Sequence, residues 1–514
     1  MIKPSIMKEN EQSAARSTRR NFMASLGITG LASVSDFGMW SANPVNLGGN
    51  TNPRQDLYDL IGDPQQFRPE EASVIDKIKH EFIDRAVNLK WYGAKGDGVT
   101  DDSAAWNAAI QDVPPGGALY VPPSSQPYYS EHGFVCDRDN ITIFGSGQGS
   151  CLLAGVQKNT LLLGSLDRTT KRRNIKVHSM KFSQTAGPSG SGRANNFAGL
   201  KCWLVDDVVI TDNDFENCDV GVSLASGHAS LGFPGRVGHR NIVVGNRVRN
   251  SNKMGIEVFF QDNASVLFNH IINEKSYGPA ESHGIRLIGS HHSRCIGNDV
   301  ERFRTGVSNQ GGESGGFRSS DSFVIALNTI RHCLIGIEGF NSVFNGELML
   351  NTIESVRALG LNFINSKAGN WDNIIAVSNV ISCQPNSPEN SQYGARFSGG
   401  GRFVFRDNHS FGFGNGMTSG IAYHVYVDGI RKLGIIEDNY FEDQYYRSAD
   451  SRNVGVRAFN NATVVISRKN IFISPSPNAD EQNMQHVGSK GTFTKGYAGI
   501  EDMNDYLLYS DGLE

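Results

Sequence analysis

The stretch Val208-Val209-Ile210-Thr211-Asp212-Asn213 is an alternating apolar run that ends on an asparagine, and Gly221-Val222-Ser223-Leu224 soon starts another such run. Both phrases return along the chain. The asparagines that close the first phrase are Asn213, Asn246, Asn269, Asn298, Asn328, Asn351, Asn379, Asn408, Asn439 and Asn470. The glycines that open the second phrase are Gly221, Gly255, Gly284, Gly306, Gly336, Gly360, Gly394, Gly420 and Gly455. Subtracting neighbouring asparagine numbers gives 23 to 33 residues, which is the spacing of a solenoid.

Short alternating runs rich in Val, Ile and Phe predict strands, whereas a helical solenoid would repeat its apolar residues every three or four positions. A β-propeller blade needs about 40 to 45 residues, which is more than one repeat provides. The pattern therefore predicts a parallel β-helix with two strands and an asparagine bend in each rung. We expect the asparagine to tolerate left-handed backbone angles at the bend and to stack its amide on the next rung.

Composition excludes several classes of function. The chain has 514 residues with 58 glycines, 19% charged residues and a formal net charge of -4, so no broad basic surface for nucleic acid is expected. The seven cysteines form no close pairs, which argues against a zinc site. Cys218 and Cys333 each precede a repeat glycine by three residues and are expected to be buried thiols. No cofactor is predicted, and calcium dependence is left open.

The N-terminus carries Ser17-Thr18-Arg19-Arg20-Asn21-Phe22-Met23 before a mildly apolar stretch that reaches about Ser35. This resembles a twin-arginine export signal, and the apolar stretch is too short to span a membrane, as is every other segment. We expect export to the periplasm or beyond. The predicted organisation is a leader at 1–40, a linker at 41–86, the β-helix at 87–474 and a C-terminal cap or tail at 475–514.

Ahead of the repeats, the segment from Val87 to Ile110 contains Trp91-Tyr92-Gly93-Ala94-Lys95-Gly96-Asp97-Gly98-Val99-Thr100-Asp101-Asp102. It resembles the opening motif of the pectate-lyase-like superfamily, which includes polysaccharide lyases, hydrolases and tailspike depolymerases. The resemblance covers roughly residues 87–470 and implies an all-β fold, a right-handed parallel β-helix with an N-terminal capping helix. We expect Thr100 or Asp101 to cap that helix at its N-terminus. A twin-arginine leader before a β-helix is also similar to proteins of bacterial exopolysaccharide clusters.

One strand position carries polar residues through the repeat, two residues after each glycine. With period-two alternation these side chains should point outward, in a row spaced about 4.8 Å per rung. The resemblance implies that such a row binds a glycan. Its members are Ser223, Glu257, Arg286, Ser308, Glu338, Asn362 and Arg396.

The candidate catalytic residues are Glu257, Glu281, His283, Arg286 and Glu338. Hydrolysis of a glycosidic bond needs two carboxyl groups roughly 5 to 9.5 Å apart, which Glu257 with Glu281 or with Glu338 would supply. A lyase needs a base near the proton next to a uronate carboxylate, together with cations. Strict alternation would turn His283 inward, so a core histidine and a functional histidine both stay open.

The candidate substrate-binding residues come from the same rungs and from two insertions, 225–240 and 310–321, which we expect to form the walls of a groove. They are Phe233, Asp262, His270, His291, Arg318 and Arg396.

The expected function is an exported enzyme that cleaves an acidic, bacterial polysaccharide by hydrolysis or β-elimination. The rungs contain no Asn-Thr-Asp triplet, which departs from the polygalacturonases. A non-catalytic factor that binds or assembles exopolysaccharide and a uronate epimerase are the alternatives. The expected partner is a polysaccharide, and because trimers occur among similar proteins, a homotrimer is the assembly that the resemblance suggests.

Overall fold

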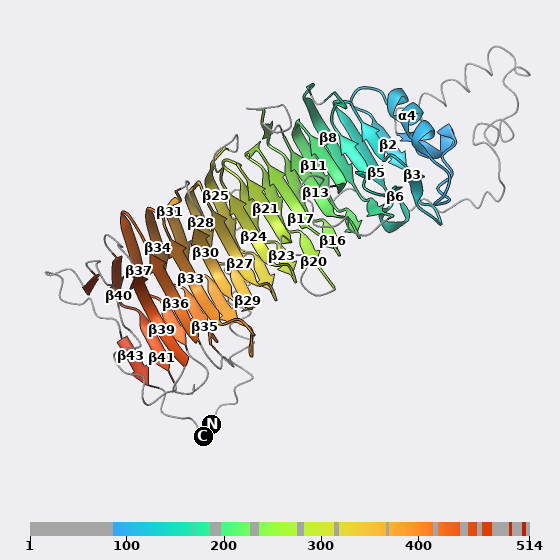
Figure 1. Ribbon diagram of the computed structural model, residues 1–514. Helices are drawn as coiled ribbons and strands as arrows, with labels where there is room; N and C mark the ends of the chain where they lie inside the picture. Colours follow the sequence, from blue (N-terminus) through green and yellow to red (C-terminus); the bar gives the residue numbers. More distant parts are fainter. Residues whose placement is uncertain are drawn as a thin grey trace, which may run out of the picture. The chain divides into compact units, whose positions relative to one another are not determined.

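The computed structural model describes residues 86–167, 169–185, 197–226, 236–274, 282–312, 318–365, 370–414, 420–442, 451–459, 465–474, 493–495 and 506–509. All of them lie in one compact unit, Asn52–Glu514. The described strands form three long parallel sheets, here named A, B and C, and each rung between the two ends contributes one strand to each (Figure 1). The right-handed parallel β-helix is confirmed, with three strands per rung where the sequence predicted two. The third strand is the short segment that follows each asparagine.

Sheet A consists of β1 (Val87–Asn88), β2 (Ala118–Val121), β5 (Ile141–Gly145), β8 (Arg172–His178), β11 (Val205–Thr211), β15 (Ile242–Val244), β19 (Ser265–Leu267), β22 (Arg294–Ile296), β25 (Ser320–Ala326), β28 (Val343–Met349), β31 (Asp372–Val377), β34 (Arg402–Arg406), β37 (Leu433–Glu437), β40 (Val465–Arg468) and β42 (Phe493–Lys495).

Sheet B consists of β3 (Tyr128–Ser130), β6 (Cys151–Ala154), β9 (Lys181–Gln184), β12 (Asp214–Glu216), β16 (Arg247–Arg249), β20 (His270–Ile272), β23 (Asp299–Glu301), β26 (Thr329–Arg331), β29 (Thr352–Val356), β32 (Val380–Cys383), β35 (His409–Phe411), β38 (Tyr440–Glu442), β41 (Ile471–Ser474) and β43 (Tyr506–Tyr509).

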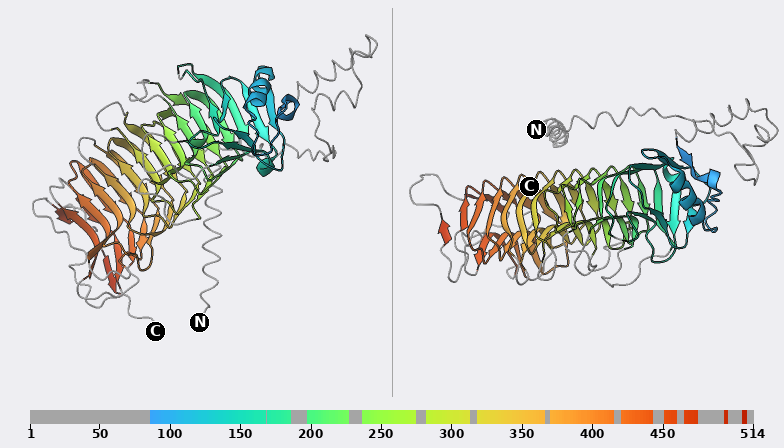
Figure 2. Two further views of the ribbon diagram at one scale, coloured as in Figure 1. Left: turned by 45° about the vertical axis from the view of Figure 1, so that its right-hand side comes forward. Right: turned by 90° about the horizontal axis from the view of Figure 1, so that it is seen from above.

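Sheet C consists of β4 (Phe134–Cys136), β7 (Leu161–Leu163), β10 (Ala198–Trp203), β13 (Val220–Ala225), β17 (Met254–Phe259), β21 (His283–Ile288), β24 (Thr305–Gln310), β27 (Ile335–Phe340), β30 (Leu359–Ile364), β33 (Ser391–Ser398), β36 (Gly420–Asp428) and β39 (Ser451–Phe459). A short pair, β14 (Gly238–His239) and β18 (Gln261–Asp262), lies in the turns between sheets C and A. Both views of Figure 2 show the described rungs following one another in chain order.

The asparagine column forms a continuous hydrogen-bonded ladder between sheets A and B. The Asn298 Nδ2 group donates to Asn328 Oδ1 at 3.0 Å, and Asn328 Nδ2 donates to Asn351 Oδ1 at 3.0 Å. The stacking prediction is confirmed, but the left-handed backbone lies one residue earlier, for example at Leu327 with φ 57°. The asparagine is therefore needed for its amide, which satisfies buried polar groups at the bend.

The repeat glycines open the sheet C strands because neighbouring rungs approach too closely there for a side chain. A Cβ atom at Gly336 would lie 2.5 Å from the carbonyl oxygen of Gly360 and 2.5 Å from Ile353 Cγ2. At Gly284 the nearest atom would be Val300 Cγ1, at 2.2 Å. Both contacts are shorter than any Cβ tolerates, so the column requires glycine.

The helix α4 (Ser103–Asp112) stands at the blue end of the stack (Figure 1), where it contacts β1 and β4. Two short 3-10 helices, η3 (Leu89–Tyr92) and η4 (Gly147–Gly149), lie in the same region. The prediction that Thr100 or Asp101 caps the helix was wrong, because the N-cap residue is Asp102, which makes no side-chain cap bond. Asp101 does accept the Ser103 N–H at 2.8 Å, and Thr100 bonds to Asp97. Trp106 is fully buried and donates from Nε1 to the Val135 carbonyl, which fixes the helix on the end of the core.

The core runs through the stack as one cluster of apolar side chains. All seven cysteines are buried free thiols, as predicted for Cys218 and Cys333, and burial raises the pKa of the Cys333 thiol to about 12. Among the described residues, no helix is long and apolar enough to cross a membrane. The predicted leader, 1–40, lies outside the described residues, as does the predicted linker, 41–86, except for residue 86. The strands β42 and β43 extend sheets A and B into the segment after residue 475.

Candidate functional site

The predicted polar row exists on the outer face of sheet C. Strand pairing places Ser223, Glu257, Arg286 and Ser308 on consecutive rungs, and Leu224 and Val258, one position further along their strands, lie in the core. The pairing also extends the row in both directions beyond the residues that the sequence predicted. The complete row is Lys201, Ser223, Glu257, Arg286, Ser308, Glu338, Asn362, Arg396, Tyr426 and Arg457.

Glu257 and Glu338 are three rungs apart, which separates their Cα atoms by about 14 Å. Glu257 accepts a hydrogen bond from Ser223 at 2.7 Å, one rung earlier, and Glu338 accepts one from Asn362 at 3.0 Å, one rung later. The two carboxylates thus lean away from each other. Their separation exceeds the roughly 5 to 9.5 Å that a glycosidase pair needs, so this pairing was wrong.

The two glutamates also differ in their surroundings. Glu257 is 5% exposed, while Glu338 is half-buried. Burial raises the pKa of Glu338, against the opposing effects of the Asn362 hydrogen bond and the positive charges of Arg304 and Arg286. A carboxyl group with a raised pKa keeps a proton to higher pH, which suits Glu338 to donate one.

His283 lies on the outer side of sheet C, so the alternation argument for an inward side chain was wrong. In the pairing of β17 with β21, His283 and Ile285 have partners but Gly284 between them has none. Gly284 and Ile285 both face the core, so the alternation is interrupted and His283 lies on the opposite face. His283 follows Met254 in a column that continues to Tyr393, whose ring contacts Tyr426 of the polar row. Met254 belongs to an apolar cluster separate from the main core, which agrees with this direction.

The environment of His283 favours its neutral form. The side chain is 7% exposed, and its Nδ1 atom has no hydrogen-bond partner among the described residues. Burial, together with the positive charges of Arg286 and Arg304, holds the pKa of His283 well below its usual value of 6.5. A neutral imidazole can accept a proton at neutral pH.

Arg304 is a member of this site that the sequence reasoning missed. It directly precedes β24, its backbone N–H donates to Ser282 Oγ at 3.0 Å, and its charge acts on both His283 and Glu338. Within the described residues its guanidinium forms no ion pair or hydrogen bond. Arg286, in contrast, donates to Gln310 Oε1 at 2.5 Å. The row was aligned on the residues that follow each repeat glycine, and Arg304 precedes its glycine, Gly306. A search of the residues just before each sheet C strand would have identified it.

A second group of charged residues lies at the corner between sheets C and A. Asp262 on β18 accepts from Arg318 at 2.7 Å, and its Oδ1 is 3.9 Å from His291 Nδ1. Burial and the nearby Arg318 charge lower the pKa of His291. The structure therefore brings together three predicted binding residues from three separate rungs.

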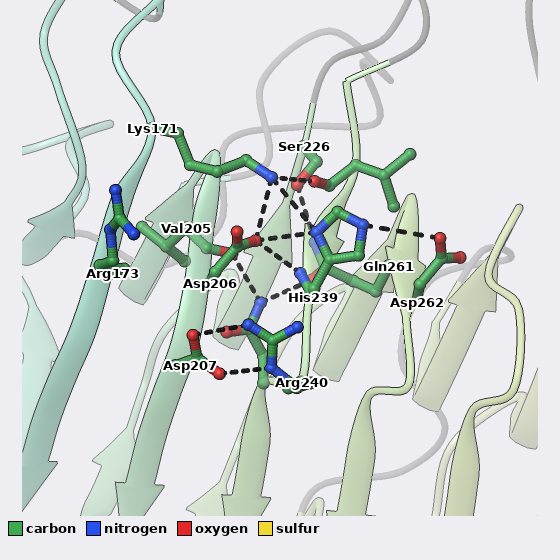
Figure 3. A network of polar contacts seen from close by, with 12 residues as sticks. Lys171, Arg173, Val205, Asp206, Asp207, Ser226, His239, Arg240, Gln261 and Asp262 are labelled. Carbon is green, nitrogen blue, oxygen red and sulfur yellow. Dashed lines mark hydrogen bonds and ion pairs between the residues drawn. The ribbon is translucent and has the colours of Figure 1, made fainter.

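The same corner contains an ionic network that continues through His239 (Figure 3). His239 lies between two carboxylates, with Nδ1 3.0 Å from Asp206 Oδ1 and Nε2 3.8 Å from Asp262 Oδ2. Lys171 bonds to Asp206 at 3.1 Å and to the Val237 carbonyl at 2.8 Å. A cavity of about 390 Å³ is lined by Thr169, Lys171, Leu204, Arg236, Val237, His239 and Asp262. Most of these charges already have partners, so the network primarily holds the corner together.

The remaining predicted residues do not join either group. His270 lies on sheet B, where its ring is 3.0 Å from Asp299, whereas Asp262 lies in the turn between sheets C and A. Arg396 is in the polar row, four rungs beyond Arg286. Glu281 and Phe233 lie outside the described residues. Across the described ranges, no group of three or more His, Cys, Asp or Glu side chains is spaced to hold a metal ion.

Comparison with known proteins agrees with this architecture. A family described as rhamnogalacturonase A/epimerase, pectate lyase-like, matches residues 86–343, half of the chain. The pre-neck appendage protein of Bacillus phage phi29 is 27% identical over 192 residues, which are 35% of this chain and 21% of that protein. This chain thus matches about a fifth of the length of that relative.

Two solved structures extend the comparison along most of the chain. A variant of DFA-IIIase from Arthrobacter chlorophenolicus, in complex with DFA-III, has a TM-score of 0.50 at 12% identity and covers 80% of this chain and 99% of its own. The mannuronan C-5 epimerase A-module from Azotobacter vinelandii has a TM-score of 0.48 at 15% identity, and the match covers 79% of this chain and 99% of that module. At these identities the first likeness shows a shared fold, and the second adds no argument.

Proposed function

Because this chain belongs to the rhamnogalacturonase A/epimerase, pectate lyase-like family, we propose that it is an enzyme that acts on an acidic polysaccharide at the outer face of sheet C. The observation that carries the proposal is a buried histidine whose Nδ1 has no hydrogen-bond partner among the described residues, on the same strand as Arg286 and one rung before Arg304. His283 lies near Arg286 and Arg304, and the same arginines act on Glu338. This set of residues, here called the His283 centre, fits chemistry at the carbon next to a uronate carboxylate.

In the proposed reaction Arg304 and Arg286 bind the uronate carboxylate, which makes the neighbouring C5 proton more acidic. His283 takes that proton, and the electron pair left at C5 forms the C4–C5 double bond as the C4–O bond breaks. Glu338 gives its proton to the departing oxygen. The products are an unsaturated uronate and a new chain end, and solvent returns both residues to their starting protonation states.

Epimerisation is the second candidate, because the family description includes an epimerase and the first proton transfer is shared. In that case a proton returns to C5 from the opposite face and the chain length does not change. Hydrolysis receives less support, since the Glu257 and Glu338 carboxylates are too far apart.

A single experiment separates these reactions. The protein is incubated in deuterated buffer with polygalacturonate, alginate and bacterial acidic exopolysaccharides, and products are followed by ultraviolet absorbance, reducing ends and deuterium at C5. β-Elimination gives absorbance and new ends together, and epimerisation gives C5 deuterium without shortening. New ends without absorbance would indicate hydrolysis and contradict the proposed chemistry. No change in any substrate would favour a non-catalytic binding factor.

A further inference from the structure

Far from the His283 centre, the outer face of sheet C carries a second cluster of three tyrosines and two arginines. Strand pairing aligns Arg396, Tyr426 and Arg457 on consecutive rungs of the polar row. The same pairing aligns Tyr393 with Tyr423 in the neighbouring column. We call these five residues the tyrosine-arginine cluster. Apart from Arg396, they were not predicted from the sequence.

The rings of this cluster support one another. Tyr393 and Tyr423 stack with centroids 5.3 Å apart and planes 15° from parallel. Tyr426 meets both rings edge-on, at 5.4 and 5.2 Å. Aromatic side chains packed in this way lose little further entropy when a ligand binds, so they form a rigid base.

Each arginine of the cluster lies over one of the stacked rings. The Arg396 guanidinium carbon is 5.7 Å from the Tyr393 centroid, and that of Arg457 is 5.6 Å from the Tyr423 centroid. Arg457 also donates to the Tyr423 hydroxyl at 2.7 Å. Two rungs separate the arginines, which sets their Cα atoms about 10 Å apart. The rings position both guanidinium groups without neutralising them.

The charge of Arg396 is not balanced by a carboxylate within the described part of the chain, where its guanidinium forms no ion pair and no hydrogen bond. By contrast, Arg402 on sheet A pairs with Asp372 at 3.1 Å, and Arg468 pairs with Glu437. Asp428 is the acidic group that lies near Tyr426. A half-buried guanidinium without a counterion favours a ligand with a planar anionic group, above all a carboxylate.

The position of the cluster relates it to the His283 centre. Arg286 and Arg396 belong to the same row and are four rungs apart, or about 19 Å between Cα atoms. An extended polysaccharide that lies along the row would meet both places, whereas a short oligosaccharide would reach one of them. The two places are therefore spaced to contact different parts of a long chain.

We propose that the tyrosine-arginine cluster is a distal binding subsite for the carboxylates of a long polyuronate chain. Only the choice of ligand class rests on the proposed function. Arg396 and Arg457 bind carboxylates of the polysaccharide while its reacting sugar lies at the His283 centre. The subsite raises the affinity for long chains, which reach both places at once, more than it raises the affinity for short ones, which reach one place at a time.

The test compares Arg396→Gln/Arg457→Gln with the wild type, and Arg402→Gln serves as a control that removes an ion-paired arginine from sheet A. Binding of long polygalacturonate and of trigalacturonate is measured by titration calorimetry at fixed salt. Loss of two charge-assisted contacts should weaken long-chain binding by about tenfold or more. Trigalacturonate, which reaches one place at a time, should lose much less affinity than the long chain, and the Arg402→Gln variant should match the wild type with both ligands. An equal loss in the control, or no loss in the double variant, would overturn the subsite.

Further probes separate this inference from the proposed reaction. His283→Gln should bind long polygalacturonate as the wild type does, whatever its turnover. If binding depends on the two arginines but no substrate is turned over, the subsite is supported and the proposed reaction is contradicted. If the double variant turns over substrate and binds long chains as the wild type does, the reaction is supported and the subsite is contradicted. Neutral dextran should not bind. Binding of dextran sulfate but not of polygalacturonate would overturn the assignment to carboxylates. If the double variant does not fold, Arg396→Lys retains the charge without the planar fork and should show a smaller loss of the same kind.

Discussion

The direction of His283 depends on the residue that follows it. Gly284 has no side chain, so the neighbouring rung packs closely against its Cα atom and both Gly284 and Ile285 turn toward the core. His283 then falls on the outer side, near Arg286 and Arg304. A one-residue irregularity in the strand changes which face a side chain occupies, because side chains in a strand alternate strictly.

The depressed pKa of His283 makes stability depend on pH. Its folded pKa lies below the usual value of 6.5, so the unfolded chain binds a proton more readily. The stability contribution is complete above pH 6.5 and is lost as the pH falls toward the folded pKa, by up to about 1.4 kcal/mol per pH unit.

We therefore expect the wild type to lose more free energy of unfolding than His283→Gln between pH 7.5 and pH 5.5, as measured by urea titration. Other histidines titrate equally in both proteins and cancel in the difference. His132→Gln, which alters an exposed histidine, should follow the wild type. Parallel pH profiles for the wild type and His283→Gln would show that His283 is not held neutral by the fold.

Arg304 should contribute to turnover and not to folding, since its guanidinium forms no ion pair within the described ranges. Removing a charged contact to the uronate carboxylate costs about 1.5 to 3 kcal/mol, which is roughly ten- to a hundredfold in kcat/KM. We expect this loss in Arg304→Gln with an unchanged melting temperature. Arg302→Gln is the matched control, because Arg302 pairs with Glu301 at 3.1 Å. Equal activity in the two variants would exclude Arg304 from the site.

At the scale of the element, the bend between sheets A and B is held by amides. Asn328 donates to the Cys295 carbonyl at 2.9 Å and accepts the backbone N–H of Asn298 at 3.0 Å, in addition to its contacts with the neighbouring ladder amides. All of these groups are buried. The residue before it, Leu327, supplies the left-handed turn at φ 57°. In this bend, Leu327 therefore supplies the backbone turn and Asn328 supplies the hydrogen bonds.

Removing one amide from the middle of the ladder should be costly. Asn328→Ala leaves several buried donors and acceptors without partners, and each costs about 1 to 3 kcal/mol. We expect a loss of at least about 3 kcal/mol in the free energy of unfolding, measured by denaturant titration. Thr329→Ala, a half-buried position on the adjacent sheet B strand, should cost much less. Similar losses in the two variants would show that the ladder is not a special source of stability.

At the scale of the whole molecule, the parallel stack determines how far apart functional residues lie. Each rung advances about 4.8 Å, so the number of rungs fixes the separation along the row. This places the His283 centre and the tyrosine-arginine cluster on one face, although they come from distant parts of the sequence. A solenoid is suited to a long polymer because its binding positions repeat along one axis.

Export is a further proposal about the whole chain, because the leader lies outside the described residues. We propose that Arg19 and Arg20 direct the folded protein through the twin-arginine route. Arg19→Lys/Arg20→Lys should accumulate inside the cell while the wild type leaves it, as measured by cell fractionation and immunoblotting. A Lys8→Arg variant should be exported normally. Export of the double variant at the wild-type level would argue for another route.

The sequence by itself determined the β-helix, its asparagine ladder, its glycine column and the outward row that contains Glu257, Arg286, Glu338 and Arg396. These features follow from local alternation and from a repeat that returns once per rung. Only the tertiary structure decided the direction of His283, the distance between Glu257 and Glu338, the position of Arg304 and the stacking of Tyr393, Tyr423 and Tyr426. The physical reason is that contacts between rungs depend on the register of neighbouring strands and on the direction of each side chain. The sequence of one strand determines neither of these.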